Sequence, residues 1–481
     1  MKRTVFLSIV LFLCCSHARS QDSCGISWGS VVQISHDSAF SVVPQLLALG
    51  DTVHLLWFGD VPIGGGVNFG LGIQYSRSTD GGQTFSAQRQ LASYDSARGN
   101  RGFLAASGRY IYMKYIARVY SPIYDNLGIL RSTDAGLTWE PRRVLGDVNA
   151  RAITARDSSV YIYFYYVDGD TARSGLFFSH DYGVTWDSVH LPFRIRAASF
   201  VRLATSAKAL HMTRQRGING AQEIFYNRSS DFGYTWSSDD TLSLLDGWES
   251  QNARITSDGN GNLYVVWNDG KYGGDFSGTI VMRCSTDDGL TWLPEQIISQ
   301  LATAGFCDVS VEDSQVAVVW DTEITYYIHM IESRISLDRG SSWCNSNVVA
   351  SSGGDPAVSN ALKRLHAAWP DSGEIYYRQG VNGPVSVEEF RGLPKTLTLY
   401  QNYPNPFNSR TVIRYSLPVT GYVTLKVYNV LGQAVATLLD GRLSAGEHVL
   451  TWDADDVSTG IYFYSLTTES FTQTKKLILL K

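Results

Sequence analysis

The sequence of 481 residues has no excess of basic side chains: 40 Lys and Arg stand against 45 Asp and Glu, which gives a formal net charge of −5. A nucleic-acid-binding domain needs a basic face, so this balance argues against that class of function. The chain also lacks a Gly-rich phosphate loop, a His-Glu-x-x-His metal motif and a Gly-x-Ser-x-Gly nucleophile motif. We therefore expect no nucleic acid partner, no metal and no cofactor.

Long apolar runs are scarce as well. Beyond the N-terminal segment no stretch of about 18 apolar residues occurs, so the sequence predicts no transmembrane segment. The N-terminal segment has basic residues at positions 2 and 3, an apolar run over Val5–Cys15, and a small-x-small cleavage site at Ala18–Ser20. This pattern predicts a secretory signal peptide over residues 1–20. A lipoprotein signal is disfavoured because the bulky Leu13 precedes Cys14.

Cysteine is rare, with six residues, and Cys14 and Cys15 fall within the predicted signal peptide. The four that remain in the exported chain are Cys24, Cys284, Cys307 and Cys344. Their spacing fits no zinc pattern. An even number of cysteines in an exported chain allows two disulfides, with three possible pairings.

Glycine and tyrosine are abundant, with 44 and 27 residues, whereas methionine has only five. Hydrophobic residues make up 44% of the chain and charged residues 18%, a globular composition with enough apolar side chains for a large core. Many tight turns and many tyrosine-bearing strands predict an all-β fold.

A motif of the form Ser-x-Asp-x-Gly-x-Thr-Trp recurs roughly every 50 residues, with small variations. Its aspartates are Asp80, Asp134, Asp181, Asp231, Asp287 and Asp338. Repeats of this length with several short strands each are typical of a β-propeller.

The motif has a local physical explanation. The aspartate carboxylate can accept backbone N–H bonds of its own turn, the glycine can adopt positive φ at little cost, and the aromatic ring can pack over the hairpin. One functional site does not need six copies of an aspartate. We therefore interpret the six aspartates as structural residues and not as catalytic ones.

These motifs resemble the Asp-box (BNR) repeats of the sialidase-like β-propeller superfamily, over about residues 25–385. An apolar second-strand pattern appears seven times, and Trp28–Ile34 is similar to a strand that follows a box. We therefore predict a seven-bladed propeller over residues 21–385, closed by the N-terminal strand. A six-bladed propeller, as in true sialidases, is the alternative.

The C-terminal region reads as a separate module after a linker at residues 386–396. Alternating strand patterns with turn breaks predict a small Ig-like β-sandwich. The run Tyr403–Asn408, the segment Val430–Gln433 and the Lys475–Leu477 ending resemble the type A C-terminal sorting domain of the type IX secretion system, over residues 397–481. The resemblance implies passage through the periplasm, contact with that secretion machinery, and release or surface attachment. A plain Ig-like adhesion module is the alternative.

The sequence lacks part of the catalytic pattern of the sialidases that it resembles. The family's hydrolases use an arginine triad, an Asp acid/base and a Tyr nucleophile paired with a Glu. Their first arginine belongs to an Arg-Ile-Pro sequence before the first box, and the matching place here is Val42-Val43-Pro44. This departure argues against sialidase activity, so we favour binding without catalysis and assign no catalytic residue.

Four consecutive repeats nevertheless begin their innermost strand with an arginine: Arg101, Arg151, Arg202 and Arg254. In a propeller this strand begins beside the central channel, on the face opposite the box turns. Loops after the second strands reach the same face with tyrosines, for which we select Tyr115, Tyr165 and Tyr272. Guanidinium groups bind carboxylates or sulfates, and tyrosine rings stack on sugars, so this set predicts a site for an acidic glycan. Structural pairing of the arginines between blades is the alternative.

Three functions compete on this evidence. The first is a secreted or surface-attached propeller that binds a glycan or another extracellular polymer without turnover. The second is an exo-acting glycoside hydrolase of sialidase-like fold, which needs a pair of convergent carboxylates. The candidates for that pair are Asp60, Asp269, Asp275, Asp321 and Glu323. The third is a protein-interaction scaffold, which would present an apolar patch on that face.

Overall fold

In the computed structural model the chain divides after residue 384 into two compact units. The structure describes residues 25–36, 40–63, 67–92, 102–120, 123–168, 171–192, 200–272, 278–299, 303–325, 328–383, 398–402, 404–417, 421–443, 446–454, 457–468 and 471–480. The predicted signal peptide and linker lie outside these residues. Within them, no helix combines the length and the apolar character that crossing a bilayer requires.

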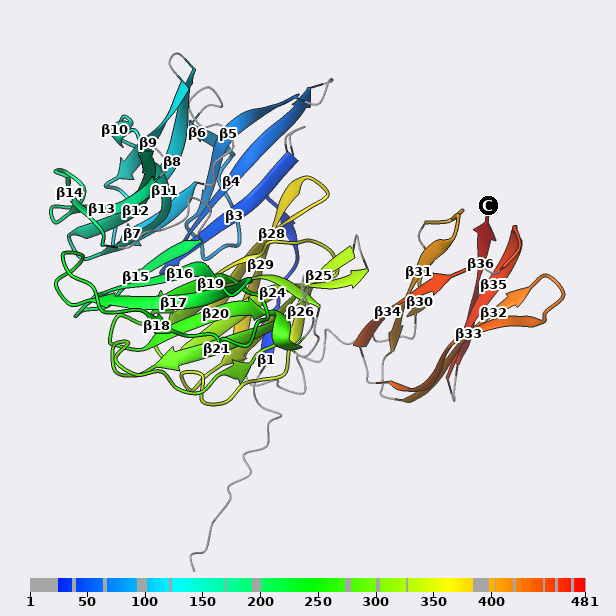
Figure 1. Cartoon of the computed structure of the whole chain (residues 1–481). Coiled ribbons are helices and arrows are strands. Elements are labelled where there is room, and N and C mark those ends of the chain that lie inside the picture. The colour runs from blue at the N-terminus through cyan, green and yellow to red at the C-terminus, as the bar shows by residue number, and fades with distance from the viewer. Residues whose placement is uncertain are drawn as a thin grey trace, which may run out of the picture. The chain divides into compact units, whose positions relative to one another are not determined.

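Among the described residues, the larger unit contains seven antiparallel sheets (Figure 1). The first strands are β3 (Phe40–Leu49), β7 (Phe103–Ser107), β11 (Asn149–Arg156), β15 (Val201–Thr205), β19 (Ser250–Ser257), β23 (Ala304–Glu312) and β27 (Ala357–Ala361). The second strands are β4 (Thr52–Ile63), β8 (Tyr110–Tyr120), β12 (Ser159–Asp168), β16 (Leu210–Ile218), β20 (Leu263–Asp269), β24 (Gln315–Thr325) and β28 (Arg364–Asp371). The third strands are β5 (Val67–Ser78), β9 (Ile123–Ser132), β13 (Thr171–Ser179), β17 (Ala221–Ser229), β21 (Thr279–Ser285), β25 (Ile328–Ser336) and β29 (Glu374–Gly383).

The outermost strands show how the unit is closed. Six sheets end in a short fourth strand: β6 (Arg89–Ala92), β10 (Arg143–Gly146), β14 (Asp187–His190), β18 (Asp240–Thr241), β22 (Gln296–Ile297) and β26 (Asn347–Ala350). The last sheet is completed from the N-terminus, because β1 (Gly25–Trp28) and β2 (Val32–Gln33) both pair with β29. The two ends of the unit therefore share one sheet.

The first strands contact one another in a closed circuit that runs from β3 through β7, β11, β15, β19 and β23 to β27, and back to β3. Such a circuit, with the later strands of each sheet further out, is the arrangement of a β-propeller. The expectation of an all-β protein is confirmed.

The second strands are buried on both faces because each sheet packs between two neighbours. At corresponding places on β4, β20 and β24, the side chains of Trp57, Trp267 and Trp320 have no exposed surface, and Trp369 on β28 is almost fully buried. Each indole buries a large apolar area, so these four residues contribute strongly to the contacts between sheets. This explains the apolar runs that mark the second strands in the sequence.

Each of the six repeated motifs forms the turn after a third strand, with its aspartate at the centre of the hydrogen bonds. In the first turn, Asp80 Oδ1 accepts from the Ser78 hydroxyl at 2.6 Å and the Thr84 N–H at 2.9 Å, and the Thr84 hydroxyl donates to Oδ2 at 2.5 Å. Equivalent bonds surround Asp134, Asp181, Asp231, Asp287 and Asp338. At Asp134 the hydroxyl of Thr138 leads these bonds in lowering the carboxyl pKa to about 2.

Each turn also contains two successive residues with positive φ, for example Ala135 at 55° and Gly136 at 78°. A Cβ at Gly136 would lie 2.1 Å from Tyr75 Oη of the preceding sheet, so glycine is required there for the close approach as well as for φ. The residue before the glycine was not expected to be left-handed. These residues are Gly81, Ala135, Tyr182, Phe232, Asp288 and Arg339.

The smaller unit consists, in its described residues, of two antiparallel sheets. One contains β30 (Thr398–Leu399), β31 (Arg410–Leu417) and β34 (Gly446–Asp453). The other contains β33 (Ala434–Leu443), β32 (Gly421–Asn429), β35 (Gly460–Thr468) and β36 (Thr472–Leu479). Ile413 from the first sheet and Leu425 and Tyr464 from the second are fully buried in one apolar core, which belongs to this unit alone.

The cysteines depart from the expectation of two disulfides. Cys344 is disulfide-bonded, whereas Cys284 and Cys307 are buried free thiols. The two thiols belong to one apolar cluster that joins β21 and β23, where each packs as a small apolar side chain. The even cysteine count therefore overestimates the number of disulfides.

Candidate functional site

The first strands begin at the end of each sheet that lies opposite the motif turn. In the third sheet, Asn149 at the start of β11 pairs with Tyr165 near the end of β12, whereas the motif turn follows Ser179, which pairs with Val160. Of the four predicted arginines, the described ones lie on first strands around the central channel; they are Arg151 on β11, Arg202 on β15 and Arg254 on β19. Arg101 lies outside the described residues.

Two of these arginines are positioned by β-bulges. The register between β11 and β12 shifts between Ala150 and Ala152, so that Arg151 is the extra residue. The register between β19 and β20 shifts between Gln251 and Arg254. A bulge bends the strand and turns side chains out of the regular alternation, and bulges are frequent beside functional sites.

The bulge of β19 and a further bulge in β3 contain left-handed backbone. Asn252, in the bulge of β19, has a φ of 59°, and Val43, in the bulge of β3, has a φ of 55°. Positive φ in a β-branched residue costs of the order of 1–3 kcal/mol, and such strain concentrates at functional sites.

Lys114 on β8 adds a fourth cation to this group. Its side chain is buried, its Nζ donates a hydrogen bond to the Ala150 carbonyl at 2.7 Å, and the same Nζ lies 4.3 Å from the centre of the Phe103 ring. The Arg202 guanidinium lies 5.1 Å from the same ring centre. Burial lowers the pKa of Lys114 well below its usual value, and the charges of Arg202 and Arg151 lower it further. The three cations are therefore close enough to act on one another.

The Arg151 guanidinium is held against an aromatic hydroxyl. Its Nη2 donates to Tyr165 Oη at 2.9 Å, and its Cζ lies 5.2 Å from the centre of the Tyr165 ring. Cation–π contact of this kind fixes a guanidinium without neutralising its charge. The predicted pair of Arg151 and Tyr165 is thus brought together.

Arg254 faces a carboxylate. Its Nε lies 3.8 Å from Asp308 Oδ1, and its Nη1 is buried without a hydrogen-bond partner among the described residues. Asp308 Oδ2 accepts the Val358 N–H at 3.0 Å. Burial raises the pKa of Asp308, while Arg254 and Arg202 act in the opposite direction. A buried guanidinium donor without a partner is costly, so Arg254 keeps an unmet capacity for a hydrogen bond.

The channel mouth is therefore polarised. Cations come from β8, β11, β15 and β19, whereas β23 carries Asp308, which faces Arg254. The basic part can bind a carboxylate or sulfate, and the acidic part can accept hydrogen bonds from hydroxyl groups. Within the described residues, His, Cys, Asp and Glu side chains form no group that could hold a metal ion.

Two of the candidate catalytic carboxylates are engaged by neighbouring groups of the protein. Asp269 Oδ2 accepts from Trp267 Nε1 and from the Ser250 hydroxyl, both at 3.0 Å. Asp321 Oδ1 accepts the Phe306 N–H at 2.6 Å, and Asp321 Oδ2 lies 2.9 Å from His329 Nδ1. Both carboxylates thus hold the ends of their strands.

Asp321 and His329 form an ion pair at the edge of this face. The hydrogen bond to Asp321 raises the pKa of His329, and Glu323 acts in the same direction. The side chains of Asp60 and Asp275 lie outside the described part of the chain.

The other two selected tyrosines lie apart from the arginines. Tyr115 is buried, with its ring over Gly128 and its hydroxyl bonded to Arg142. Tyr272, in the short 3₁₀ turn η3 (Gly270–Tyr272), donates its hydroxyl to Glu295 at 2.9 Å. Neighbouring residues of one strand face opposite sides, which is why Tyr115 is directed away from the side chain of Lys114.

Sequence reasoning missed Lys114. A signal was available, because it is a lone charged residue in the run Tyr110–Ile116, which is otherwise apolar or aromatic. The bulges at Arg151 and Arg254 left no comparable mark in the sequence.

Comparison with known families identifies the C-terminal module. Residues 401–480 match the secretion system C-terminal sorting domain. This domain directs a chain through the type IX secretion system, so the protein is exported to the cell surface or the extracellular space. No curated protein matches the chain in sequence.

Three of the solved structures that are similar to this chain are compared with it by identity, coverage and TM-score. A protein of unknown function from Dyadobacter fermentans has a TM-score of 0.47 at 12% identity, over 75% of this chain and 99% of that one. The α-L-arabinofuranosidase Arb93A of Fusarium graminearum has a TM-score of 0.45 at 14% identity, over 74% and 98%. The sialidase of Trypanosoma rangeli in complex with sialic acid has a TM-score of 0.44 at 13% identity, over 94% and 88%.

Proposed function

We propose that this protein is an exported, seven-bladed, Asp-box propeller that binds an acidic glycan, or another anionic extracellular polymer, at the mouth of its central channel without catalysis. An Ig-like C-terminal sandwich would carry the sorting signal. The observation that carries the proposal is the placement of Lys114 and Arg202 over the Phe103 ring, with Arg151 close enough to act on Lys114, together with the buried Nη1 of Arg254.

The chemistry of the mouth favours a sugar acid over a simple anion. A carboxylate or sulfate can take bidentate hydrogen bonds from a guanidinium, which a lone ammonium cannot provide. Hydroxyl groups of the same sugar can donate to Asp308, and its ring can lie against Tyr165. The ligand would thus match both the basic and the acidic part of the mouth.

Binding is preferred to hydrolysis for two reasons. The chain has Val42-Val43-Pro44 where the sialidase pattern requires its first arginine. Asp269 accepts a hydrogen bond from Trp267 of its own strand, and Asp321 accepts one from the Phe306 N–H of the neighbouring β23. A glycosidase needs two carboxyl groups about 5–10 Å apart that flank the scissile bond, free to exchange protons.

The blade number of seven is supported by the seven sheets of the larger unit, if each is taken as one blade. The shared last sheet of β1, β2 and β29 would then act as the closure between the ends of the propeller. Whether the protein is released or attached to the cell surface depends on the fate of the sorting domain.

A glycan array with the full chain, read at low and at high salt, tests this function. We expect acidic glycans to bind at low salt and Arg151→Ala to lose most of this binding. Arg156→Ala is the matched control, because Arg156 lies on the same strand β11 at its far end, beside Asp157. Mass spectrometry of the supernatant should find no released sugar. Released monosaccharide would establish hydrolysis instead, and absence of any binding would contradict the proposal.

A further inference from the structure

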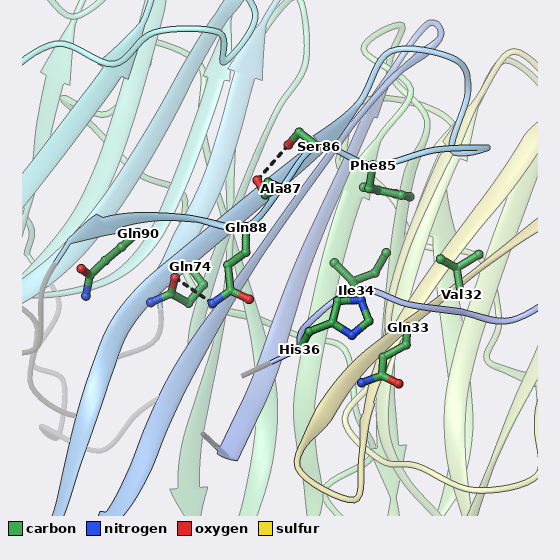
Figure 2. A pocket seen from close by; sticks show the side chains of 10 residues that line it. All are labelled: Val32, Gln33, Ile34, His36, Gln74, Phe85, Ser86, Ala87, Gln88 and Gln90. Carbon is green, nitrogen blue, oxygen red and sulfur yellow. Dashed lines mark hydrogen bonds between the residues drawn. The ribbon is translucent and has the colours of Figure 1, made fainter. Parts of the chain in front are cut away.

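A hollow lies where the N-terminal segment meets the first sheet, away from the arginines of the channel mouth. It encloses about 710 Å³, a volume typical of a small-molecule site. Figure 2 shows Val32, Gln33 and His36 on one side of it, and Gln74 and Gln88 on the other. We call this hollow the seam groove.

The seam groove exists because the N-terminal segment is added to the last sheet. Gln33 on β2 pairs with Tyr376 on β29, and the Ile34 N–H donates to the Ile375 carbonyl at 2.8 Å. The opposite side is formed by β5, β6 and the segment that follows the first motif turn. In that segment Phe85 packs edge-on against Tyr377, with ring centres 4.8 Å apart. The two ends of the propeller thus form the two sides.

The groove is lined by amides. Four glutamines surround it: Gln33, Gln74, Gln88 and Gln90. Gln88 Nε2 donates to Gln74 Oε1 at 3.2 Å, and Gln33 Nε2 donates to the Ser35 carbonyl at 2.9 Å, so these amides are held in place. A glutamine side chain both donates and accepts, which suits the vicinal hydroxyls of a sugar.

The lining also restricts the charge of a ligand. Among the described residues that line the groove there is no Asp, Glu, Lys or Arg. A charged ligand would lose hydration there without meeting an opposite charge. Phe85 and Ile34 supply apolar surface, which can cover the C–H face of a sugar ring.

An extended peptide fits this groove less well. Peptides that add to a sheet edge need a row of backbone groups along a strand. The strands at this place are short, because β2 has two residues and β6 has four. Side-chain amides, and not a strand edge, are therefore the main polar groups that a ligand would meet.

We propose that the seam groove binds a neutral oligosaccharide. This site is separate from the channel mouth and does not depend on the function proposed for it. A ligand that contacts both sides would bind only the closed ring, so it would stabilise the folded propeller by mass action.

The test uses the full chain and a panel of uncharged oligosaccharides, with affinity measured by calorimetry and thermal unfolding measured alongside. We expect a neutral oligosaccharide to bind and to raise the unfolding temperature. Gln33→Ala combined with Gln88→Ala should weaken binding about tenfold, since two hydrogen-bonding side chains are lost. Gln33→Ala alone, at an exposed position that the fold tolerates, should weaken it about threefold.

Two controls separate this site from the rest of the protein. Gln83→Ala removes an exposed glutamine of the first motif turn that does not line the groove, and binding should be unchanged. Arg151→Ala should leave neutral binding intact, so failure at the channel mouth would not be confused with failure here. The proposal is overturned if no neutral oligosaccharide binds, or if the double variant binds one as tightly as the original chain. It is also overturned if the groove binds a peptide instead and the glutamine substitutions weaken that binding.

Discussion

The channel mouth and the seam groove are both formed by strands of different sheets, and they differ in charge. The mouth holds Lys114, Arg151 and Arg202 within electrostatic reach of one another. The groove, in its described lining, has four glutamines and no carboxylate, ammonium or guanidinium. Both regions have polar side chains. At the mouth the neighbouring cations repel one another, and an anionic ligand would reduce this repulsion.

This difference explains what each region can discriminate. Burial and the neighbouring positive charges disfavour the ammonium form of Lys114, so its pKa is lowered. An anion relieves that repulsion, so the mouth selects by charge and responds to salt and pH. Amides select by hydrogen-bond geometry, and their interaction with a ligand is insensitive to both conditions. Four experiments test this difference between the two regions.

The largest effect is expected from the combination of Arg151→Ala with Arg254→Ala. Hydrogen bonds to charged groups contribute about 1.5–3 kcal/mol each, so the loss of two should weaken acidic-glycan binding by at least about 100-fold. Titration calorimetry with an acidic oligosaccharide measures this. Affinity of the seam groove for neutral sugars should be unchanged; a parallel loss at both sites would show that the variant is misfolded.

The second-largest effect is expected from salt, which should weaken ligand binding at the channel mouth more than binding in the seam groove. Raising the ionic strength from about 0.01 M to about 1 M shortens the Debye length from about 30 Å to about 3 Å. We expect acidic-glycan binding to weaken by roughly tenfold, because the half-exposed guanidiniums are screened. Neutral binding should change by less than about twofold. Equal salt dependence of both ligands would contradict the comparison.

The pH dependence should follow Lys114. Its pKa is lowered in the free protein by burial and by Arg202 and Arg151. A bound anion favours the ammonium form and raises that pKa, so binding takes up a proton. Affinity for an acidic glycan should therefore fall as the pH rises from the free to the bound pKa. Dissociation constants measured across this range test the effect, and Lys114→Met should flatten the profile; a profile unchanged in that variant would assign the proton to another group.

The smallest effect is expected from Gln88→Glu in the groove. A carboxylate there replaces two donors by acceptors and lacks a positive partner, so neutral-sugar affinity should fall by about three- to tenfold. The channel mouth should not respond. Surface plasmon resonance with both ligand types on one sample checks this, and a change in acidic-glycan binding would show that the two regions are coupled.

The sequence predicts much of the fold because the repeated turn is local. Ser78, Asp80 and Thr84 close their turn without help from distant residues, so six copies of the pattern locate six third strands. The left-handed residue before each glycine was missed, since positions such as Tyr182 and Arg339 give no residue-type signal. The backbone N–H of such a residue donates to the turn between the first and second strands of its own sheet, as Ala135 does to the Arg109 carbonyl at 2.9 Å.

The candidate site could be predicted only in part. The regular spacing in sequence between each arginine and the following second strand correctly placed Arg151, Arg202 and Arg254 on first strands. Tyr165 contacts Arg151 because β11 and β12 pair. Tyr115 and Lys114 lie side by side in sequence and on opposite sides in space, so the choice between them needed the strand's orientation. The seam groove joins Gln33 to Gln88 across the closure of the ring, and no local pattern connects them.

The most direct test of the anion site compares Arg254→Ala with Arg156→Ala in equilibrium binding of one acidic oligosaccharide to the full chain at low salt. Both variants remove one guanidinium from a first strand, Arg254 at the channel mouth and Arg156 at the opposite end of its sheet. We expect Arg254→Ala to weaken binding by at least about tenfold and Arg156→Ala to leave it unchanged. Equal affinities for the two variants would contradict this expectation.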